Sequence, residues 1–331
     1  MKIHIVFPFK QGPWGGGNQF LTALKEIFRA RGIFAKSPED ANVILFNSHH
    51  SLSNIVSLRA MYPNCVFVHR VDGPLTLVRG GGIRNRMIDR AIFSLTRSIA
   101  DVTIFQSQWS KDQATQFGYR PRPFDTIIHN ACNKEIFFPK TEGRDRRKKI
   151  SLIMTSWSAN MNKGFAMYSY LDQHLDFSKY DCTFIGNTPV SFSHIRVLPP
   201  VSSEDIATYL READIFVTAS RHDPCSNALI EALSVGLPAV ALNDGGHPEL
   251  VQKGGVIFHN IEDILQSIDT VAENYAFYRQ QVPLFSIENV AENYVAVMEK
   301  CLGEPMPVQR THISFGTWCV LYLLGKYNKQ G

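Results

Sequence analysis

The sequence predicts an α/β fold built from two doubly wound, Rossmann-like domains whose parallel sheets face each other across a cleft. The length of 331 residues suits about two domains at roughly 150 residues each. Short runs rich in Val, Ile and Phe alternate with stretches long enough for a helix, as in βαβ units. This alternation stops at a basic stretch, residues 140–149, and then starts again. The restart indicates a second domain of the same class.

The first domain is expected to span residues 1–139. Its strands are placed where the apolar runs are continuous, because strands of a parallel sheet are buried on both faces. These runs are 2–8, 42–47, 65–68 and 102–106. Each interval between them can hold a helix, which predicts parallel strands joined by crossovers.

The second domain is expected to span residues 150–302, after a linker at 140–149. Its predicted strands are 150–156, 181–186, 214–219, 238–242 and 255–258. Its predicted helices are 164–175, 203–212, 225–235, 261–276 and 288–302. In sheets of this kind ligands bind beyond the carboxyl ends of the strands, so candidate functional residues are sought there.

The tail, residues 303–331, contains twelve mostly apolar residues from Ile313 to Leu324. Twelve residues are too few to cross a bilayer, which takes about twenty. Two interpretations remain. The favoured one packs the tail back on the first domain, and the other lays it on a membrane surface.

Composition excludes several classes of protein. A hydrophobic share of 44% with 22 Gly and 17 Pro does not fit a disordered or low-complexity chain. The net charge is +4, and residues 140–149, with six basic and two acidic side chains, account for it. The rest of the chain is balanced, so no nucleic-acid partner is expected. The basic stretch is interpreted as a solvated linker, with peripheral contact to an anionic membrane left open.

The six cysteines contain no CxxC pair and no metal-ligand spacing. This distribution predicts reduced thiols and no structural zinc. The chain opens directly with a predicted strand and lacks the layout of a secretory signal, so a cytoplasmic protein is expected, either free or peripheral on the inner face of the membrane.

A glycine-rich loop, Gly15-Gly16-Gly17, follows the first predicted strand. Without Cβ atoms, these residues let backbone N–H groups approach an anion or a sugar closely. As a dinucleotide fingerprint the loop fails, because Phe20 stands where a small residue is needed and no acidic residue ends a second strand. A turn without a ligand is the alternative.

Titratable residues also follow the strand at 65–68. His69 and Asp72 lie at its carboxyl end, where catalytic groups of α/β domains often stand. The alternative is a histidine that only bonds a backbone carbonyl.

The region from 221 to 238 carries the signals of a helix: Asp223 as N-cap, Pro224 at the first helical position, and Gly236 just past the end. Within this mostly apolar helix, Glu231 belongs to a narrow polar stripe. A carboxylate buried without a partner is costly, so Glu231 is expected to be bonded or to face a ligand. Asp223 has a sufficient structural explanation as a cap.

A polar turn after the strand at 150–156 ends in Lys163, at the mouth of the next helix. There it could meet a diphosphate together with the N–H groups at the start of the 225–235 helix. A solvated surface lysine is the alternative.

Taken together, these motifs resemble the family 4 retaining glycosyltransferases of the GT-B type, among the glycosyl transferases group 1, over most of residues 1–300. The family's glutamate, seven residues and second glutamate correspond to Asp223 and Glu231 here, followed by Gly236-Leu237-Pro238 and Gly245-Gly246. Its Lys-Gly is similar to Lys163-Gly164, its glycine loop to residues 15–17 and its strand-end histidine to His69.

The sequence departs from the family pattern at three places. The first glutamate is Asp223, the Gly-Phe-Gly that often follows it is Pro224-Cys225-Ser226, and Ser158 stands near the place of a family arginine. These departures concern the donor and its diphosphate contacts rather than the fold.

The resemblance implies transfer of a hexose from a nucleoside diphosphate sugar to a hydroxyl of a glycan or lipid-linked glycan, with retention and without metal or other cofactor. It makes the first domain the acceptor side and the second the donor side. Glu231 would bind the ribose hydroxyls, Asp223 the donor sugar, and Lys163 the diphosphate. The other implied contacts are N–H groups near Ser226 and Asn227 to the diphosphate, Gly16 and Gly17 to donor or acceptor, and His69 to the donor sugar.

Rival functions are kept open. A sugar-nucleotide epimerase or a phosphorylase of the same two-domain build stays compatible with the sequence. A catalytically silent binding subunit would be expected to lose Lys163 or Glu231, and both are present. A nicotinamide-dependent oxidoreductase would need the glycine fingerprint that this chain lacks.

Overall fold

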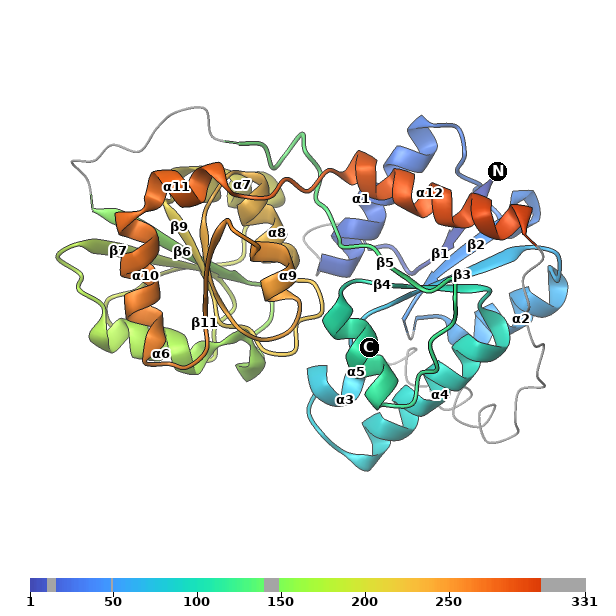
Figure 1. Ribbon diagram of the computed structural model, residues 1–331, viewed down its shortest axis with the longest axis horizontal. Coiled ribbons are helices and arrows are strands. Elements are labelled where there is room, and N and C mark those ends of the chain that lie inside the picture. The colour runs from blue at the N-terminus through green and yellow to red at the C-terminus, as the bar shows by residue number, and fades with distance from the viewer. Residues whose placement is uncertain (11–15, 49, 140–148, 305–331) are drawn as a thin grey trace. The chain divides into compact units, whose positions relative to one another are not determined.

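The computed structural model of the chain describes residues 1–10, 16–48, 50–139 and 149–304 (Figure 1). The chain divides into two compact units. Of the described residues, unit 1 comprises those within Met1–Phe9, Leu24–His129 and 288–304, and unit 2 those within Lys10–Ala23 and Asn130–Ile287. Each unit contains one parallel sheet with helices packed against it. The predicted α/β class with two parallel sheets is confirmed.

The sheet of unit 1 has the order β1-β2-β3-β4-β5. Its strands are β1 (Ile3–Val6), β2 (Val43–Asn47), β3 (Val66–Val71), β4 (Val102–Phe105) and β5 (Thr126–Ile127). Ile3 pairs with Val43 on one side and forms a parallel bridge with Phe34 on the other. The chain therefore winds away from β1 in both directions, which makes this sheet doubly wound.

The helices of unit 1 cover this sheet. They are α1 (Gly16–Ala30), whose first turns belong to unit 2, η1 (Pro38–Asp40), α2 (Leu52–Met61), α3 (Leu75–Val78), α4 (Ile83–Ile99), α5 (Gln108–Gln116) and α12 (Ile287–Gly303). One core cluster joins Phe46 and Phe67 of the sheet to Ile55 of α2 and Ile92 of α4. Burying these side chains contributes roughly 1.5–3 kcal/mol each.

The sheet of unit 2 has the order β11-β10-β9-β6-β7-β8. Its strands are β6 (Ile150–Ser156), β7 (Tyr180–Gly186), β8 (Arg196–Leu198), β9 (Ile215–Thr218), β10 (Ala239–Leu242) and β11 (Gly255–Phe258). From β6 the chain adds β7 and β8 on one side, then returns to place β9 on the other side. The direction of winding thus reverses between β6 and β9, where sheets of this kind bind ligands.

Helices cover both faces of this second sheet. They are η2 (Met161–Lys163), α6 (Phe165–His174), α7 (Ser203–Glu212), α8 (Asn227–Ser234), α9 (His247–Val251), α10 (Asp263–Glu273) and α11 (Tyr275–Gln280). Successive residues of β6 point to opposite faces: Met154 packs with Phe165 and Ile268, whereas Ile153 packs with Leu233. The two apolar cores explain why the centre of this strand, Leu152-Ile153-Met154, is apolar.

The unit boundaries differ from the expected domains, and this part of the prediction is wrong. Residues 130–139 belong to unit 2, and α12 belongs to unit 1 rather than to the second domain. The reason is packing: Tyr294 and Met298 of α12 are fully buried, and Arg31 at the end of α1 pairs with Glu292 at 3.1 Å. The linker at 140–148 and the tail beyond 304 lie outside the described residues, so their predicted roles stay predictions.

Helix α8 also begins later than expected. Its N-cap is Ser226, whose hydroxyl accepts a hydrogen bond from the backbone N–H of Leu229, so the prediction that Asp223 caps this helix is wrong. The end agrees with the sequence: Gly236 has a φ of +84° and donates its N–H to the Leu233 carbonyl at 2.9 Å. Asp223, freed from capping, contacts Lys163 instead.

A capping test follows from this start of α8. Ser226→Ala is expected to lower the free energy of unfolding by about 1 kcal/mol, because the N–H of Leu229 loses its acceptor, whereas Ser226→Gly should cost only a few tenths. Denaturant titration of the two variants and the wild type measures the difference. Equal stability of Ser226→Ala and wild type would contradict the assignment of the cap.

Candidate active site

Unit 2 contains a pocket of about 360 Å³ at the carboxyl ends of its central strands. Ser156 ends β6 and Thr218 ends β9, and both line the pocket, so it lies where the strand order reverses. Its other polar lining side chains include Lys163, Ser220, Asp223, Ser226, Asn227 and Glu231. Residues that are far apart in the sequence therefore meet in one pocket.

An ion pair between Lys163 and Asp223 forms part of the pocket wall. The Lys163 Nζ lies 2.9 Å from Asp223 Oδ2. Gly164 turns the chain from η2 into α6 with a φ of +92°, and a Cβ there would lie 2.7 Å from the backbone of Ala219, just after β9. The glycine therefore allows the close approach that brings Lys163 to Asp223, which accounts for the Lys-Gly pair physically.

The Asp223 carboxylate is kept ionised by its surroundings. Burial alone would raise its pKa, but the Lys163 ammonium, the nearby His247 and the N–H of Cys225 hold the pKa below the usual value. Its backbone is held by the Gly245-Gly246 turn: the N–H of Gly246 donates to the Asp223 carbonyl at 2.9 Å, and a Cβ at Gly245 would overlap the Asp223 backbone.

Sequence reasoning missed the pair formed by Ser220 and His247, although the turn that leads into His247 was recognised. His247 is fully buried, with Nδ1 3.0 Å from the Leu242 carbonyl and Nε2 3.2 Å from the Ser220 hydroxyl. A carbonyl can only accept, so Nδ1 carries the proton and Nε2 accepts from Ser220. Burial lowers the pKa of His247. His247 thereby orients a hydroxyl in the pocket wall.

Glu231 is the carboxyl group that the site leaves without a partner. It lines the pocket from α8, and no described residue donates a hydrogen bond to its side chain or forms an ion pair with it. Burial raises the pKa of Glu231 to about 8. The Glu231 carboxyl is therefore mostly protonated at neutral pH, and hydroxyl or amine donors of a ligand would favour its ionised form.

The raised pKa of Glu231 has a consequence for stability. In the unfolded chain this carboxyl loses its proton near pH 4.5, but in the folded protein near pH 8, so raising the pH through this window favours unfolding. Glu231→Gln removes the titration. We expect its melting temperature to equal that of the wild type near pH 4.5 and to exceed it by about 2 °C or more at pH 8. A difference that does not grow with pH would contradict the burial of this carboxyl.

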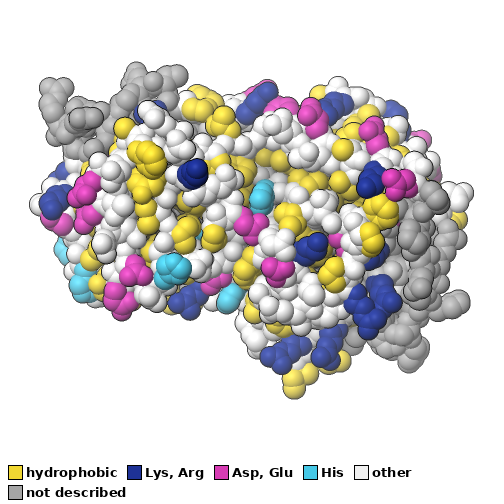
Figure 2. Space-filling view, viewed as in Figure 1, with side chains coloured by type: hydrophobic (Ala, Val, Ile, Leu, Met, Phe, Trp, Pro, Cys, Tyr) yellow, Lys and Arg dark blue, Asp and Glu magenta, His cyan; other side chains and the backbone are white. Residues whose placement is uncertain are grey.

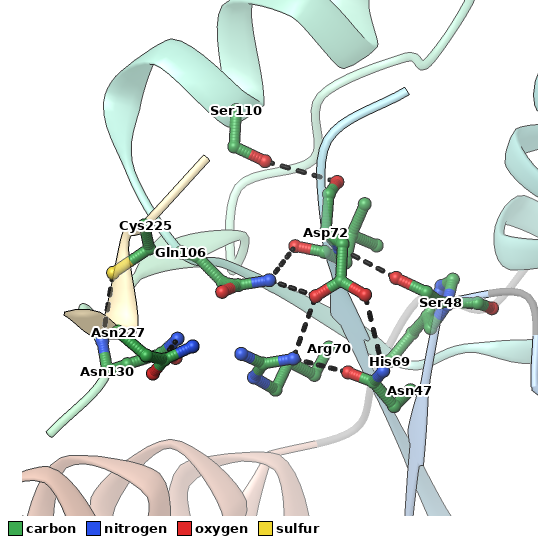
Figure 3. A network of polar contacts seen from close by, with 11 residues as sticks. Asn47, Ser48, His69, Arg70, Asp72, Gln106, Ser110, Asn130, Cys225 and Asn227 are labelled. Carbon is green, nitrogen blue, oxygen red and sulfur yellow. Dashed lines mark hydrogen bonds and ion pairs between the residues drawn. The ribbon is translucent and has the colours of Figure 1, made fainter. Parts of the chain in front are cut away.

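Of the other residues predicted to contact the donor, Gly16, Ser226 and Asn227 line the pocket and Gly17 does not. Gly16 and Asn227 both line the pocket, and a Cβ on Gly16 would overlap the Asn227 side chain. Gly17 has open space around its Cα and is not part of the pocket lining. Asn227 accepts a hydrogen bond from the Asn130 side chain at 3.2 Å, and the backbone N–H of Asn130 contacts Cys225 Sγ at 3.3 Å (Figure 3).

His69 lies in unit 1 with its ring enclosed by protein, so its predicted contact with a donor sugar stays a prediction. The ring is fully buried, with Nδ1 2.8 Å from the Thr96 hydroxyl and Nε2 3.0 Å from the Ser48 carbonyl. It also stacks on Phe46 at 4.4 Å. Burial lowers the pKa of His69 to about 4. The structural alternative, a histidine that bonds a backbone carbonyl, is the one that the structure supports.

Beside His69, the carboxyl edge of the unit 1 sheet carries a network centred on Asp72 (Figure 3). Arg70 donates to Asp72 Oδ1 at 2.9 Å and to the Asn47 side chain, and Gln106 donates to the same carboxylate. Arg70 is fully buried, whereas Asp72 is partly exposed. The network joins β2, β3 and the end of β4. Asp72 is its partly exposed member.

Within residues 1–10, 16–48, 50–139 and 149–304, no group of three or more His, Cys, Asp or Glu side chains is arranged to hold a metal ion. Within the same ranges, no helix combines the length and the apolar character needed to span a membrane.

Part of the chain is similar in sequence to known proteins. Residues 182–274 match the model of the family described as Glycosyl transferases group 1, a region that contains both Asp223 and Glu231. A curated relative, Spore coat protein SA of Bacillus subtilis (strain 168), is 31% identical over 81 residues. This match covers 24% of the present chain and 22% of that protein, less than a quarter of its length.

Solved structures resemble a much larger part of the chain. Anabaena Alr3699/HepE in complex with UDP and glucose has a TM-score of 0.70 at 14% identity, with 91% of this chain and 100% of that chain covered. Sucrose-phosphate synthase from Thermosynechococcus elongatus has a TM-score of 0.66 at 14% identity, with 99% and 98% covered. The fold is GT-B. The group 1 match lies within unit 2 and includes the pocket residues Asp223 and Glu231, so this pocket is the candidate active site, and the family match supports glycosyl transfer.

Proposed function

We propose that this GT-B protein is a metal-independent glycosyltransferase, which moves a hexose from a nucleoside diphosphate sugar to a hydroxyl of a glycan or lipid-linked glycan with retention of configuration. The observation that carries the proposal is the pairing of two features in one pocket: the Glu231 carboxyl without a protein partner, and the Lys163 ammonium at its polar wall. Together they match the two ends of a nucleoside diphosphate.

The nucleoside end is assigned to Glu231. A ribose carries two neighbouring hydroxyls, and both can donate to the two oxygens of one carboxylate. Such bonds to an ionised acceptor are stronger than neutral ones, and they would draw the pKa of Glu231 down from about 8 when the donor binds. Anabaena HepE, which shares the fold, was solved with UDP and glucose, and this supports a nucleotide sugar as the donor.

The diphosphate end is assigned to Lys163 and the first N–H groups of α8, near Ser226 and Asn227. As the bond between the sugar and the diphosphate breaks, the electron pair goes to the diphosphate oxygen and negative charge grows there. A preorganised ammonium and a helix N-terminus stabilise this charge. They supply the positive potential that a metal ion could otherwise provide, so the proposal needs no metal.

Asp223 is assigned to the transferred sugar. Its carboxylate is ionised, oriented by Lys163 and held by the Gly245-Gly246 turn, so it can accept hydrogen bonds from sugar hydroxyls. The acceptor hydroxyl forms the new bond to the anomeric carbon and gives its proton to the departing diphosphate. Attack from the side on which the diphosphate leaves retains the configuration.

The test is incubation of the purified chain with a panel of nucleoside diphosphate sugars, with and without short glycan and lipid-linked glycan acceptors. Release of nucleoside diphosphate that depends on an acceptor, with a retained anomeric configuration in the product, is expected. Conversion of a donor without diphosphate release would indicate an epimerase, and a requirement for inorganic phosphate a phosphorylase. Donor binding without any turnover would indicate a silent subunit. Each of these three outcomes would overturn the proposal.

A further inference from the structure

An exposed corner of unit 1, between α3 and α4, combines large apolar side chains with arginines. Ile83 is 81% exposed and Met87 is 54% exposed. They stand four residues apart near the start of α4, so they share one face of the helix. Aliphatic side chains exposed side by side and bordered by polar residues commonly mark an interaction surface.

The exposed charged side chains of the segment around these two residues are all arginines. Residues 79–97 contain five arginines and one acidic residue, Asp89. Asp89 is buried, whereas Arg79, Arg86 and Arg90 are exposed. Figure 2 shows Lys and Arg side chains gathered around hydrophobic ones at the lower edge of unit 1. We call the surface formed by Arg79, Ile83, Arg86, Met87 and Arg90 the arginine face.

The arginine face is fixed to the rest of unit 1. The Asp89 carboxylate accepts hydrogen bonds from the N–H of Leu75 at 2.8 Å, and from the N–H and hydroxyl of Thr76 at 2.9 and 2.6 Å. These bonds tie the start of α3 to α4. On its other side α4 packs Ile92 and Phe93 into the core. The face is thus presented on a firmly packed helix, and the one acidic side chain of residues 79–97 is hydrogen-bonded internally.

We propose that the arginine face docks the protein on an anionic phospholipid surface. Guanidinium groups form paired hydrogen bonds with phosphate oxygens, and arginines close to an anionic bilayer are attracted to its surface potential. Ile83 and Met87 point from the same helix face and would enter the boundary between headgroups and acyl chains, as the apolar side of an interfacial helix does. A phosphate backbone of nucleic acid offers nothing to these two side chains, so a lipid surface is the better match.

This inference does not rest on the proposed transfer activity, and it places membrane contact at a surface other than the basic linker and the tail. Its test uses the full chain and no sugar donor. Sedimentation is measured with vesicles of phosphatidylcholine alone and of three parts phosphatidylcholine to one part phosphatidylglycerol. The variants are Arg79→Gln/Arg86→Gln/Arg90→Gln and Ile83→Ser/Met87→Ser. The control, Arg120→Gln/Lys179→Gln/Lys253→Gln, removes the same net charge at exposed positions elsewhere.

The wild type is expected to bind the anionic vesicles only, and to lose binding as salt is raised. Each arginine near the surface contributes about a fivefold change in affinity, so the triple arginine variant should bind at least tenfold more weakly. The Ile83/Met87 variant should also weaken binding severalfold, and the control should not. Unchanged melting temperatures would show that the variants are folded. Absence of wild-type binding, equal binding by the arginine variant, equal loss in the control, or duplex DNA binding that ignores Ile83 and Met87 would each overturn the proposal.

Discussion

Replacing Lys163 with alanine is expected to lower the rate of sugar transfer by about 100-fold, mainly in kcat. The Lys163 ammonium lies in the donor pocket and would act on the charge that grows on the departing diphosphate, so its loss affects the transition state more than the bound donor. The change also leaves the buried Asp223 carboxylate without its ion-pair partner, and the pKa of Asp223 should then rise.

Two variants control for this change. Lys163→Arg keeps the positive charge and should retain more activity than Lys163→Ala. Lys149→Ala removes a lysine at the opposite end of β6, where its Nζ contacts the Phe177 carbonyl, and should leave transfer unchanged. Steady-state kinetics with and without EDTA measure all three. Wild-type rates for Lys163→Ala, or a strict need of the wild type for a divalent metal, would contradict the assigned role.

The strand pattern was predictable because both sheets are buried on both faces. β6 was expected at 150–156 and spans those residues, because helices cover each side of it and its central residues, Leu152-Ile153-Met154, are apolar and buried. β5 and β8 were not predicted. They have two and three residues, and neither strand has a buried residue, so neither leaves an apolar run in the sequence.

Where an element packs is harder to predict than whether it forms. The apolar face of α12 was visible in the sequence, but a helical pattern does not say which sheet will cover it. The partner became clear only from contacts such as that between Arg31 and Glu292, which are separated by 261 positions. The prediction of the N-cap of α8 was wrong for a similar reason. Asp223 and Ser226 are both good caps, and the contact of Asp223 with Lys163, 60 positions away, decides between them.

Site residues could likewise be predicted where the local sequence decides their role, and not where distant residues decide it. Glu231 could be predicted, because a carboxyl in an apolar helix needs a special reason to be there. His69 could not be decided from its place at a strand end, since its two ring nitrogens are occupied by Ser48 and Thr96, which are distant in the sequence. Ser220 and His247 are also distant in the sequence: Ser220 follows β9, and His247 begins α9 after the neighbouring strand β10.

Glu231→Gln is expected to reduce donor turnover by at least about 100-fold. The proposed contact is a pair of bonds from ribose hydroxyls to an ionised carboxylate, each contributing about 1.5 kcal/mol or more, and about 3 kcal/mol corresponds to a factor of roughly 100 in affinity. Glutamine has nearly the same size but a single acceptor oxygen and no charge. Because the variant should also melt at a higher temperature than the wild type at pH 8, lost activity cannot be ascribed to misfolding.

The pH dependence of donor binding separates this role from a merely structural one. In the free wild type the pKa of Glu231 is about 8, so binding that needs the carboxylate must first remove a proton at pH 6 and 7. The affinity for a nucleoside diphosphate should therefore rise more steeply between pH 6 and pH 8 in the wild type than in Glu231→Gln, because the phosphate of the ligand titrates equally in both. Calorimetry at several pH values measures both slopes, and proton release on binding gives a second readout. Parallel slopes in the two proteins would mean that another group controls binding, and Glu231 would then lose its assignment to the ribose.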